Sequence, residues 1–475
     1  MLFSNPIFLF LFLPFTLFIY YILPKRFKNS FLLFVSLFFY TWGEKELVLL
    51  IITSTLIDYC SAIIIEKGRR KLGLWLSIVF NIGVLGYFKY SHFAFTNLVE
   101  ILHSFNISVA NAKQFSDVIL PLGISFYTFQ TMSYTIDVYR GEVKANKNFI
   151  NFATYVTLFP QLVAGPIVRY KTIADELTNR ITSLHLFSEG VERFIIGLAK
   201  KMLIANNCAF LADAIFSLPS NDMSFSLAWL GVIAYSFQIY FDFSGYSDMA
   251  IGLGKMFGFN FPENFNYPYT SKSIREFWNR WHITLSSWFK DYLYIPLGGN
   301  RHGELRTYFN LFFVFFITGL WHGASWTFVI WGILHGVFII IERLGFSRVL
   351  NKFPSFVSHF YLLFAVNVLW PFFRCDSISE ALGYLQSMFS FNTATNVDFL
   401  SFYLSKEIIL MMVLATIFSM PVYHKLNSIL TAPSLSTSNY KLLSFVKTGV
   451  LILLFVFCLF YVATDSYNPF IYFRF

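Results

Sequence analysis

A run of 35 residues without Asp, Glu, Lys or Arg separates Arg306 from Glu342. One bilayer crossing needs about 20 apolar residues, so this run is longer than a single membrane helix requires. As one continuous helix it would measure about 50 Å at a rise of 1.5 Å per residue. Gly319 and Gly323 lie near its middle, where small residues let helices approach closely. We therefore expect this run either to tilt steeply or to break near its middle.

Two histidines, His322 and His335, lie inside the run. An ionisable side chain at membrane depth is costly unless it faces a cavity or a partner, so each is a candidate for function. A neutral imidazole with a pKa of about 6.5 can take a proton from a hydroxyl nucleophile and return it, which suits acyl transfer from a thioester to an alcohol. For His322, catalysis and a structural hydrogen bond are equally favoured; for His335, near the far end of the run, a structural role is favoured. If the helix is continuous, Trp326 covers the His322 ring and His335 lies roughly 20 Å away, so the two histidines cannot act on one atom.

The composition is that of an integral membrane protein. Of the 475 residues, 56% are hydrophobic and 13% are charged, whereas soluble domains carry about 25% charged residues. Apolar runs recur along the whole chain and predict roughly ten to twelve membrane passages. We predict an all-α integral membrane protein that forms a single domain over residues 1–475, without an appended soluble domain.

Basic residues gather in short segments between apolar runs, at 25–28, 66–71, 140–147 and 272–306. The positive-inside rule places these segments in the cytoplasm and therefore the N-terminus outside. The first apolar run, 1–24, lacks a basic segment before it and a cleavage site after it, so we interpret it as a retained span. The net charge of +9 then reflects membrane topology, and we expect no nucleic-acid partner.

Two further stretches are too polar or too broken for lipid-facing helices. Residues 149–166 contain Pro160, and residues 237–248 contain Asp242 and Asp248. Such segments survive at membrane depth only when they are buried in protein or line a water-filled cavity. For 149–166, an interior position and an ordinary bend at the interface are equally open. For 237–248 we favour the interior, lining a central funnel.

Residues 273–291 have the pattern of one amphipathic helix in the membrane interface. At helical spacing Trp278, His282 and Leu285 share an apolar face, whereas Arg280 leans to the other side. Tryptophan and arginine on opposite faces are typical of helices that lie in the interface plane. A role in chemistry and a role as an interfacial histidine are equally open for His282.

Several classes of site are absent from the sequence. The four cysteines have no CxxC spacing, so neither a metal site nor a disulfide framework is indicated. No GxSxG motif, phosphate-binding loop or set of metal-binding carboxylates accompanies the histidines. We expect no metal and no tightly bound cofactor.

The chain resembles the membrane-bound O-acyltransferase family, in the bacterial branch typified by alginate O-acetylation. The resemblance covers nearly the whole chain and is densest over 120–340. Its motifs are specific as a set, although Trp-His-Gly alone would be weak. The matching stretches are Trp321–Gly336, Phe241–Gly254, Phe277–Ser286, Asp291–Arg301, Pro121–Gln130, Tyr139–Gly141, Phe159–Pro166 and Asn468–Phe475.

The resemblance implies a ring of helices, with interfacial and re-entrant segments, around a funnel that pierces the membrane. By resemblance, His322 corresponds to the family's intramembrane histidine, held to be essential for acyl transfer, and His282 matches a second family histidine on the cytoplasmic side. Asn279 stands where many relatives have a basic residue, and we expect no change in chemistry from it. Substrate contacts are expected from Trp321, Trp326, Asp242, Trp281 and Arg280.

The implied function is transfer of an acetyl group across a bacterial cytoplasmic membrane for O-acetylation of an extracytoplasmic polysaccharide. Acetyl-CoA is the expected donor substrate, and an extracytoplasmic esterase-like protein is the expected partner. Arg280, Lys290 and Arg301 are either neighbours of the donor's phosphates or anchors at the cytoplasmic face, and we favour anchors. Two alternatives stay open: D-alanyl transfer to teichoic acid from a carrier protein, and a polysaccharide or lipid-linked transporter, although no repeated halves of the transporter kind are visible.

Overall fold

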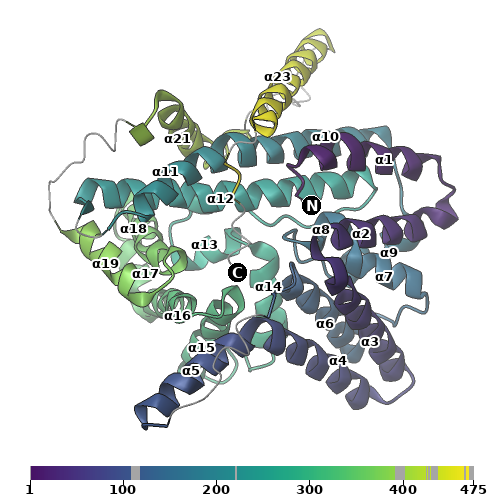
Figure 1. Ribbon diagram of the computed structural model, residues 1–475, viewed down its shortest axis with the longest axis horizontal. Helices are drawn as coiled ribbons and strands as arrows, with labels where there is room; N and C mark the ends of the chain where they lie inside the picture. Colours follow the sequence, from purple (N-terminus) through teal and green to yellow (C-terminus); the bar gives the residue numbers. More distant parts are fainter. Residues whose placement is uncertain are drawn as a thin grey trace.

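A computed structural model describes residues 2–107, 118–219, 222–390, 402–423, 425, 428, 437–464 and 467–469. Every regular element in these residues is helical, which confirms the all-α class for this part of the chain (Figure 1). Many helices begin at a residue whose side chain accepts a hydrogen bond from the first turn, as serine and asparagine do at helix N-termini. These caps are Asn148, Ser183, Ser224, Ser273, Ser325, Ser377 and Ser405.

The α-helices up to residue 216 are α1 (Leu13–Ile22), α2 (Lys28–Glu44), α3 (Val48–Glu66), α4 (Arg70–Leu85), α5 (Ser91–Ser104), α6 (Ile124–Arg140), α7 (Phe149–Thr157), α8 (Phe159–Leu162), α9 (Tyr170–Asn179), α10 (Leu184–Ala199) and α11 (Asn206–Phe216). Those that follow are α12 (Phe225–Met256), α13 (Ile274–Arg280), α14 (Ile283–Phe289), α15 (Glu304–His322), α16 (Trp326–Ile341), α17 (Ser347–Leu350), α18 (Ser355–Arg374), α19 (Ile378–Phe389), α21 (Lys406–Phe418) and α23 (Thr437–Ala463). Short π- or 3₁₀-helical turns are η1 (Phe8–Phe12), η2 (Lys25–Phe27), η3 (Lys45–Leu47), η4 (Gly86–Tyr90), η6 (Lys200–Ala205), η8 (Pro268–Thr270), η9 (Lys290–Tyr294) and η10 (Glu342–Phe346).

Helices α10 and α11 follow one another end to end through η6 and both run alongside α12 at one edge of the molecule, whereas α13 and α14 lie near its centre (Figure 1). Glycines hold α10 against α12: a Cβ atom on Gly197 would lie 2.6 Å from the carbonyl oxygen of Gly245, and one on Gly252 would lie 2.6 Å from that of Gly190. Only residues without a side chain permit this approach. Helices α5 and α23 project from the body on opposite sides (Figure 1).

Within the described residues, six helical segments are long and apolar enough to cross a membrane. The predicted ten to twelve passages are therefore not confirmed, although the multi-pass character is. The first apolar run forms only the short segment Phe8–Ile22. The run at 149–166 is divided between α7 and α8. The six segments are Lys25–Glu66, Arg70–Ser104, Leu184–Phe216, Trp326–Leu350, Ser355–Arg374 and Lys441–Ala463.

The two polar stretches lie in the protein interior. Residues 152–168 are all buried, which favours the interior position for 149–166 over a bend at the surface. Residues 238–254 of α12 are likewise buried, so the expected interior placement of 237–248 is confirmed for nearly all of its length. Polar backbone and acidic side chains at this depth are thus surrounded by other helices, as the cost of exposing them to lipid requires.

Candidate active site

The uncharged run folds into a helical hairpin with His322 at its tip. Helix α15 ends at His322, Gly323 is extended, and the Ser325 side chain caps α16. The two helices then lie against each other, because a Cβ atom on Gly332 would lie only 2.4 Å from the carbonyl oxygen of Phe315. Of the two expected geometries, a tilted helix and a broken one, the structure has the broken one.

The break overturns two expectations that assumed a continuous helix. Trp326 does not cover His322; its indole N–H donates to Oδ1 of Asn97 at 2.7 Å, and half of its surface is exposed. His335 is not about 20 Å from His322. Each imidazole lies within 5.0 Å of the Trp331 ring, so the two ring centres are at most about 10 Å apart.

His335 is held as a structural histidine would be. Its Nδ1 accepts a hydrogen bond from the indole N–H of Trp278 at 3.3 Å, and the residue is fully buried. This bond ties α16 to α13. The structural interpretation of His335 is therefore the one that its contacts favour.

His322 lies in an aromatic enclosure. Its ring centre is 5.0 Å from those of Trp321 and Trp331 and 5.4 Å from that of Phe373, and only 5% of the residue is exposed. Aromatic walls exclude water and leave the imidazole in a medium where charge interactions are stronger than in water. Chemistry at this position would therefore be shielded from bulk solvent.

His282 lies between two short helices and not within one helix. Helix α13 ends at Arg280, and His282 has a positive φ of 44° before α14 begins. The expected single helix over 273–291 is therefore wrong. The expected interfacial face is wrong too, since Trp278, His282 and Leu285 are buried inside the protein. A non-glycine residue with positive φ is unusual, and such conformations concentrate at functional sites.

The imidazole of His282 lies close to the end of α15. Its ring centre is 4.7 Å from that of Phe243 and 5.9 Å from that of Trp321. Trp321 therefore contacts both His282 and His322. Neither ring nitrogen of His282 has a hydrogen-bond partner among the residues that the structure describes, and the side chain is 0% exposed. Buried polar atoms without a protein partner are rare and call for water, an ion or a substrate.

The other three expected substrate contacts have partners of their own. Trp281 is buried, with its ring 5.5 Å from that of Trp370. Asp242 pairs with the ammonium of Lys201 at 2.8 Å, and both side chains are almost fully buried. Arg280 pairs with Glu276 on its own helix and donates to the carbonyl of Asn266. The structure thus brings together Trp321, His282 and His322, and it places Trp326 outside this group.

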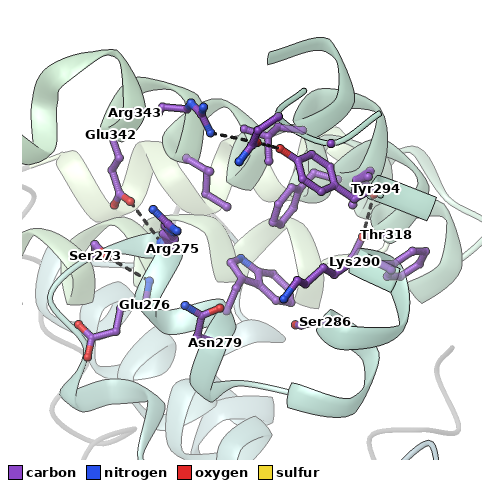
Figure 2. A pocket seen from close by; sticks show the side chains of 18 of the residues that line it. Ser273, Arg275, Glu276, Asn279, Ser286, Lys290, Tyr294, Thr318, Glu342 and Arg343 are labelled. Atoms are coloured by element: carbon purple, nitrogen blue, oxygen red, sulfur yellow. Dashed lines mark hydrogen bonds between the residues drawn. The ribbon is translucent and has the colours of Figure 1, made fainter. Parts of the chain in front are cut away.

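A cavity of about 1040 Å³ opens between α13–α14 and the α15–α16 hairpin (Figure 2). It reaches Trp278 and Thr318, and Thr318 lies about one turn before His322 on α15. Glu342 fixes one wall, because its carboxylate accepts hydrogen bonds from the backbone N–H groups of Ile274 and Arg275. Five basic side chains line the cavity: Lys272, Arg275, Lys290, Arg301 and Arg343.

A second, smaller cavity of about 100 Å³ touches the C-terminal end of α15. Its lining includes His322, Trp321 and Lys89, together with the chain from Leu120 to Phe126. His322 therefore faces the small cavity, whereas the helix that carries it also borders the large one. This arrangement suits a group transfer in which the two reactants approach from different sides.

The model of the membrane-bound O-acyltransferase family matches residues 142–387, which is more than half of the chain. The chain belongs to the membrane-bound O-acyltransferase family. It is 46% identical over 402 residues to the Pseudomonas aeruginosa protein named "Probable alginate O-acetylase AlgI", covering 83% of this chain and 76% of that protein. It is 38% identical over 432 residues to the peptidoglycan O-acetyltransferase of Helicobacter pylori, and the match covers 82% of this chain and 80% of that protein. The teichoic acid D-alanyltransferase of Bacillus subtilis is 30% identical over 228 residues, and the match covers 46% of this chain and 57% of that protein.

The sequence reasoning missed a buried cation of the acyltransferase that lies beside the end of α15. Lys89 is 8% exposed, and its ammonium donates to the carbonyl oxygen of Trp321 at 2.5 Å. The sequence did hold a signal, because Lys89 is the one charged residue between Lys71 and Glu100. Its partner is 232 residues away along the chain, and no local pattern indicates that contact.

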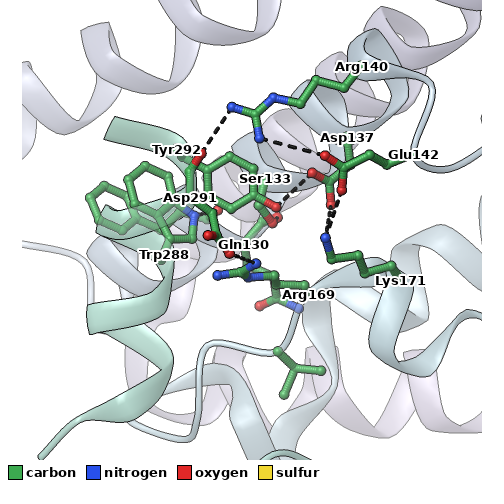
Figure 3. A network of polar contacts seen from close by, with 12 residues as sticks. Gln130, Ser133, Asp137, Arg140, Glu142, Arg169, Lys171, Trp288, Asp291 and Tyr292 are labelled. Carbon is green, nitrogen blue, oxygen red and sulfur yellow. Dashed lines mark hydrogen bonds and ion pairs between the residues drawn. The ribbon is translucent and has the colours of Figure 1, made fainter. Parts of the chain in front are cut away.

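The acyltransferase also carries a charged network beside η9 (Figure 3). The hydroxyl of Tyr292 donates to Asp137 at 2.8 Å, and burial raises the pKa of this phenol, which keeps it protonated as the donor. The guanidinium groups of Arg140 and Arg169 lie 5.2 and 5.0 Å from the centre of the Tyr292 ring. Arg169 also pairs with Asp291 at 2.6 Å. The end of α6 is thereby fastened to the segment that borders the large cavity.

Proposed function

We propose that this acyltransferase moves an acetyl group from a cytoplasmic thioester across the membrane for O-acetylation of an extracytoplasmic polysaccharide. The observation that carries the proposal is His322 at the tip of a helical hairpin, in contact with one cavity and one turn beyond another. Relatives named for O-acetylation match over 80% of the chain. The D-alanyltransferase match covers about half of it, which disfavours D-alanyl transfer.

In the proposed reaction His322 acts as the general base. Its imidazole takes the proton from the acceptor hydroxyl while the oxygen attacks the thioester carbonyl, and the proton then passes to the departing thiolate. The C–O bond forms as the C–S bond breaks, so no metal or redox step is needed. His282, which shares the Trp321 ring with His322, orients the thioester from the cytoplasmic side.

Acetyl-CoA is the proposed donor. The cavity of about 1040 Å³ is large enough for a ligand of this size, since binding pockets span about 300–1,000 Å³. Its basic side chains suit the phosphates of coenzyme A, because Lys and Arg bind phosphate through charge-assisted hydrogen bonds. Lys290 and Arg301 line this cavity, which supports a donor contact for them over an anchoring role alone; Arg280 does not line it.

We further propose that the protein lies in the bacterial cytoplasmic membrane with its N-terminus outside, and that an esterase-like partner receives the acetyl group there. Contacts that join the basic segments support the placement of these segments on the same side of the membrane, the cytoplasmic one. A guanidinium N–H of Arg140 donates to the carbonyl of Asp291 at 3.1 Å, and that of Arg70 donates to the carbonyl of Tyr139. Segments 66–71, 140–147 and 272–306 would therefore share one side.

The test is His322→Ala, with His185→Ala as the matched control. His185 is an exposed histidine on α10 that lines neither cavity. Loss of a general base costs about 10²–10⁴-fold in rate, so polymer O-acetylation should fall to background while the protein is still inserted. Unchanged acetylation in the His322 variant would refute the mechanism. Isotope-labelled acetyl-CoA with purified protein separates the classes: covalent transfer supports the enzyme, and movement of intact polymer would favour a transporter.

A further inference from the structure

The end of α15 poses a hydrogen-bonding problem. The last four carbonyl groups of any α-helix have no donor within the helix. One of them, that of Gly319, accepts from the backbone N–H of Gly323. The carbonyls of Leu320, Trp321 and His322 then need donors from elsewhere, at a place where Trp321 and His322 are buried. An unmet carbonyl here would cost about 1–3 kcal/mol.

Two adjacent side chains from η4 meet this need. The hydroxyl of Tyr90 donates to the carbonyl oxygen of Leu320 at 2.7 Å. The ammonium of Lys89 donates to that of Trp321 at 2.5 Å and lies 3.4 Å from that of His322. Among the described residues the ammonium also has Oγ of Ser125 as a hydrogen-bond partner, at 3.2 Å. Lys89 and Tyr90 together thus cap three successive carbonyls of another helix.

Electrostatics favour a cation at this position. The C-terminal end of a helix carries a partial negative charge, which a nearby ammonium stabilises. Burial of an ammonium is otherwise unfavourable, and no carboxylate among the described residues interacts with the Lys89 ammonium. The cap lies on a π-helical turn, a feature often found at functional sites. An apolar residue would fill the same space without this cost. A lysine at this position therefore indicates a role for its charge.

We propose that Lys89 and Tyr90 form an interhelical cap that fixes the end of α15 and thereby sets the position of the His322 imidazole. Lys89 is a positioning residue in this assignment, because it acts through the backbone of Trp321 and His322. It also lines the small cavity beside His322. The inference rests on the proposed function of His322 as the general base.

The variants are Lys89→Met, Lys89→Arg and Tyr90→Phe, measured as initial rates of transfer from labelled acetyl-CoA in membrane vesicles. A displacement of about 1 Å in a reacting group costs about 100-fold, so Lys89→Met should lower kcat by about that factor and leave the KM for acetyl-CoA unchanged. Lys89→Arg retains charge and donors and should recover most of the rate. Tyr90→Phe loses one hydrogen bond and should lower kcat by about 5-fold.

The matched control is Asn97→Ala. This change also removes one hydrogen bond between α5 and the hairpin, the bond from Trp326, but it leaves the end of α15 intact. It should keep the wild-type kcat. A general loss of folded protein would also lower the apparent kcat at constant KM, so each kcat is expressed per correctly inserted molecule. A lower kcat on that basis, with rescue by arginine, reports the position of the reacting group.

Wild-type kcat in correctly inserted Lys89→Met would overturn the inference. If Lys89→Met does not insert, the other two variants decide: wild-type kcat in Tyr90→Phe together with no activity in Lys89→Arg would overturn it equally. His322→Ala, measured in parallel, keeps the two hypotheses apart. An inactive His322 variant beside an active Lys89→Met refutes the cap alone, whereas an active His322 variant refutes the proposed function.

Discussion

The substitution Gly332→Ala should separate the two helices of the hairpin and misplace its tip. A Cβ atom at position 332 would lie 2.4 Å from the carbonyl oxygen of Phe315 and 2.8 Å from Cα of Gly319, whereas ordinary contact begins at 3.4 Å. Both obstacles are backbone atoms, which cannot rotate away as a side chain can. Helix α16 must therefore move from α15 by about 1 Å, and overpacking of this kind costs about 1–3 kcal/mol.

The displacement acts close to the proposed reaction centre. Gly319 lies about one turn before His322 on α15, and Trp331, next to the substituted residue, contacts the His322 ring at 5.0 Å. A shift of about 1 Å there should lower the rate of acetyl transfer about 100-fold. The assays are thermal unfolding of the purified protein in detergent and the rate of transfer from labelled acetyl-CoA per folded molecule.

Gly83→Ala is the matched control for this prediction. A Cβ atom at Gly83, on the exposed side of α4, would meet nothing within 4 Å. Alanine is favoured over glycine within helices by about 1 kcal/mol, so stability should stay level or rise. The packing argument is refuted if Gly332→Ala unfolds at the wild-type temperature and transfers acetyl at the wild-type rate.

Three further predictions follow from buried or cavity-lining contacts. Asp242→Asn leaves the charge of Lys201 without its carboxylate, so stability should fall by about 3–5 kcal/mol; unchanged thermal unfolding would contradict the structural role of this ion pair. Trp278→Phe removes the donor to Nδ1 of His335 and should cost about 1–3 kcal/mol, also read from thermal unfolding; no shift would show that this bond is not needed. Lys290→Ala should raise the KM for acetyl-CoA with little change in kcat, and an unaltered KM in steady-state kinetics would remove Lys290 from the donor site.

The sequence left two possibilities open for the uncharged run, a steep tilt and a break, and it did not indicate the geometry of the break. Two glycines and an excess of length over one bilayer allowed a break near the middle or a steep tilt. The break follows His322 because Gly323 is extended and Ser325 caps the next helix. The cap could be found from Ser325 before an apolar stretch, a known helix-start signal. That α16 returns along α15, and so brings His335 near His322, depends on packing between helices, which spacing alone does not reveal.

The second break had no comparable signal. Residues Arg280 to Ile283 contain neither glycine nor proline, so periodicity favoured a continuous helix. The positive φ of His282 is maintained by tertiary contacts instead, including a hydrogen bond from the backbone N–H of Ile283 to the carbonyl of Asn264. The predicted number of membrane passages is not confirmed, and composition is a weak guide to it for a related reason. An aromatic-rich run has the same composition whether it faces lipid or is buried among other helices, as residues 152–168 are.

The proposed general base His322 and the proposed orienting residue His282 are connected by contacts from other elements. Trp278 lies four residues before His282, and its bond to His335 joins the segment that carries His282 to the hairpin that carries His322. From η4, the Lys89 ammonium donates to the carbonyl of Trp321 at the end of α15, next to His322. His335 therefore contributes by holding two elements in register, although it stands in the same uncharged run as His322. Position in the sequence alone did not establish the roles of the two histidines. The hydrogen bond of His335 to Trp278 indicates a structural role for it and leaves His322 as the candidate reaction centre.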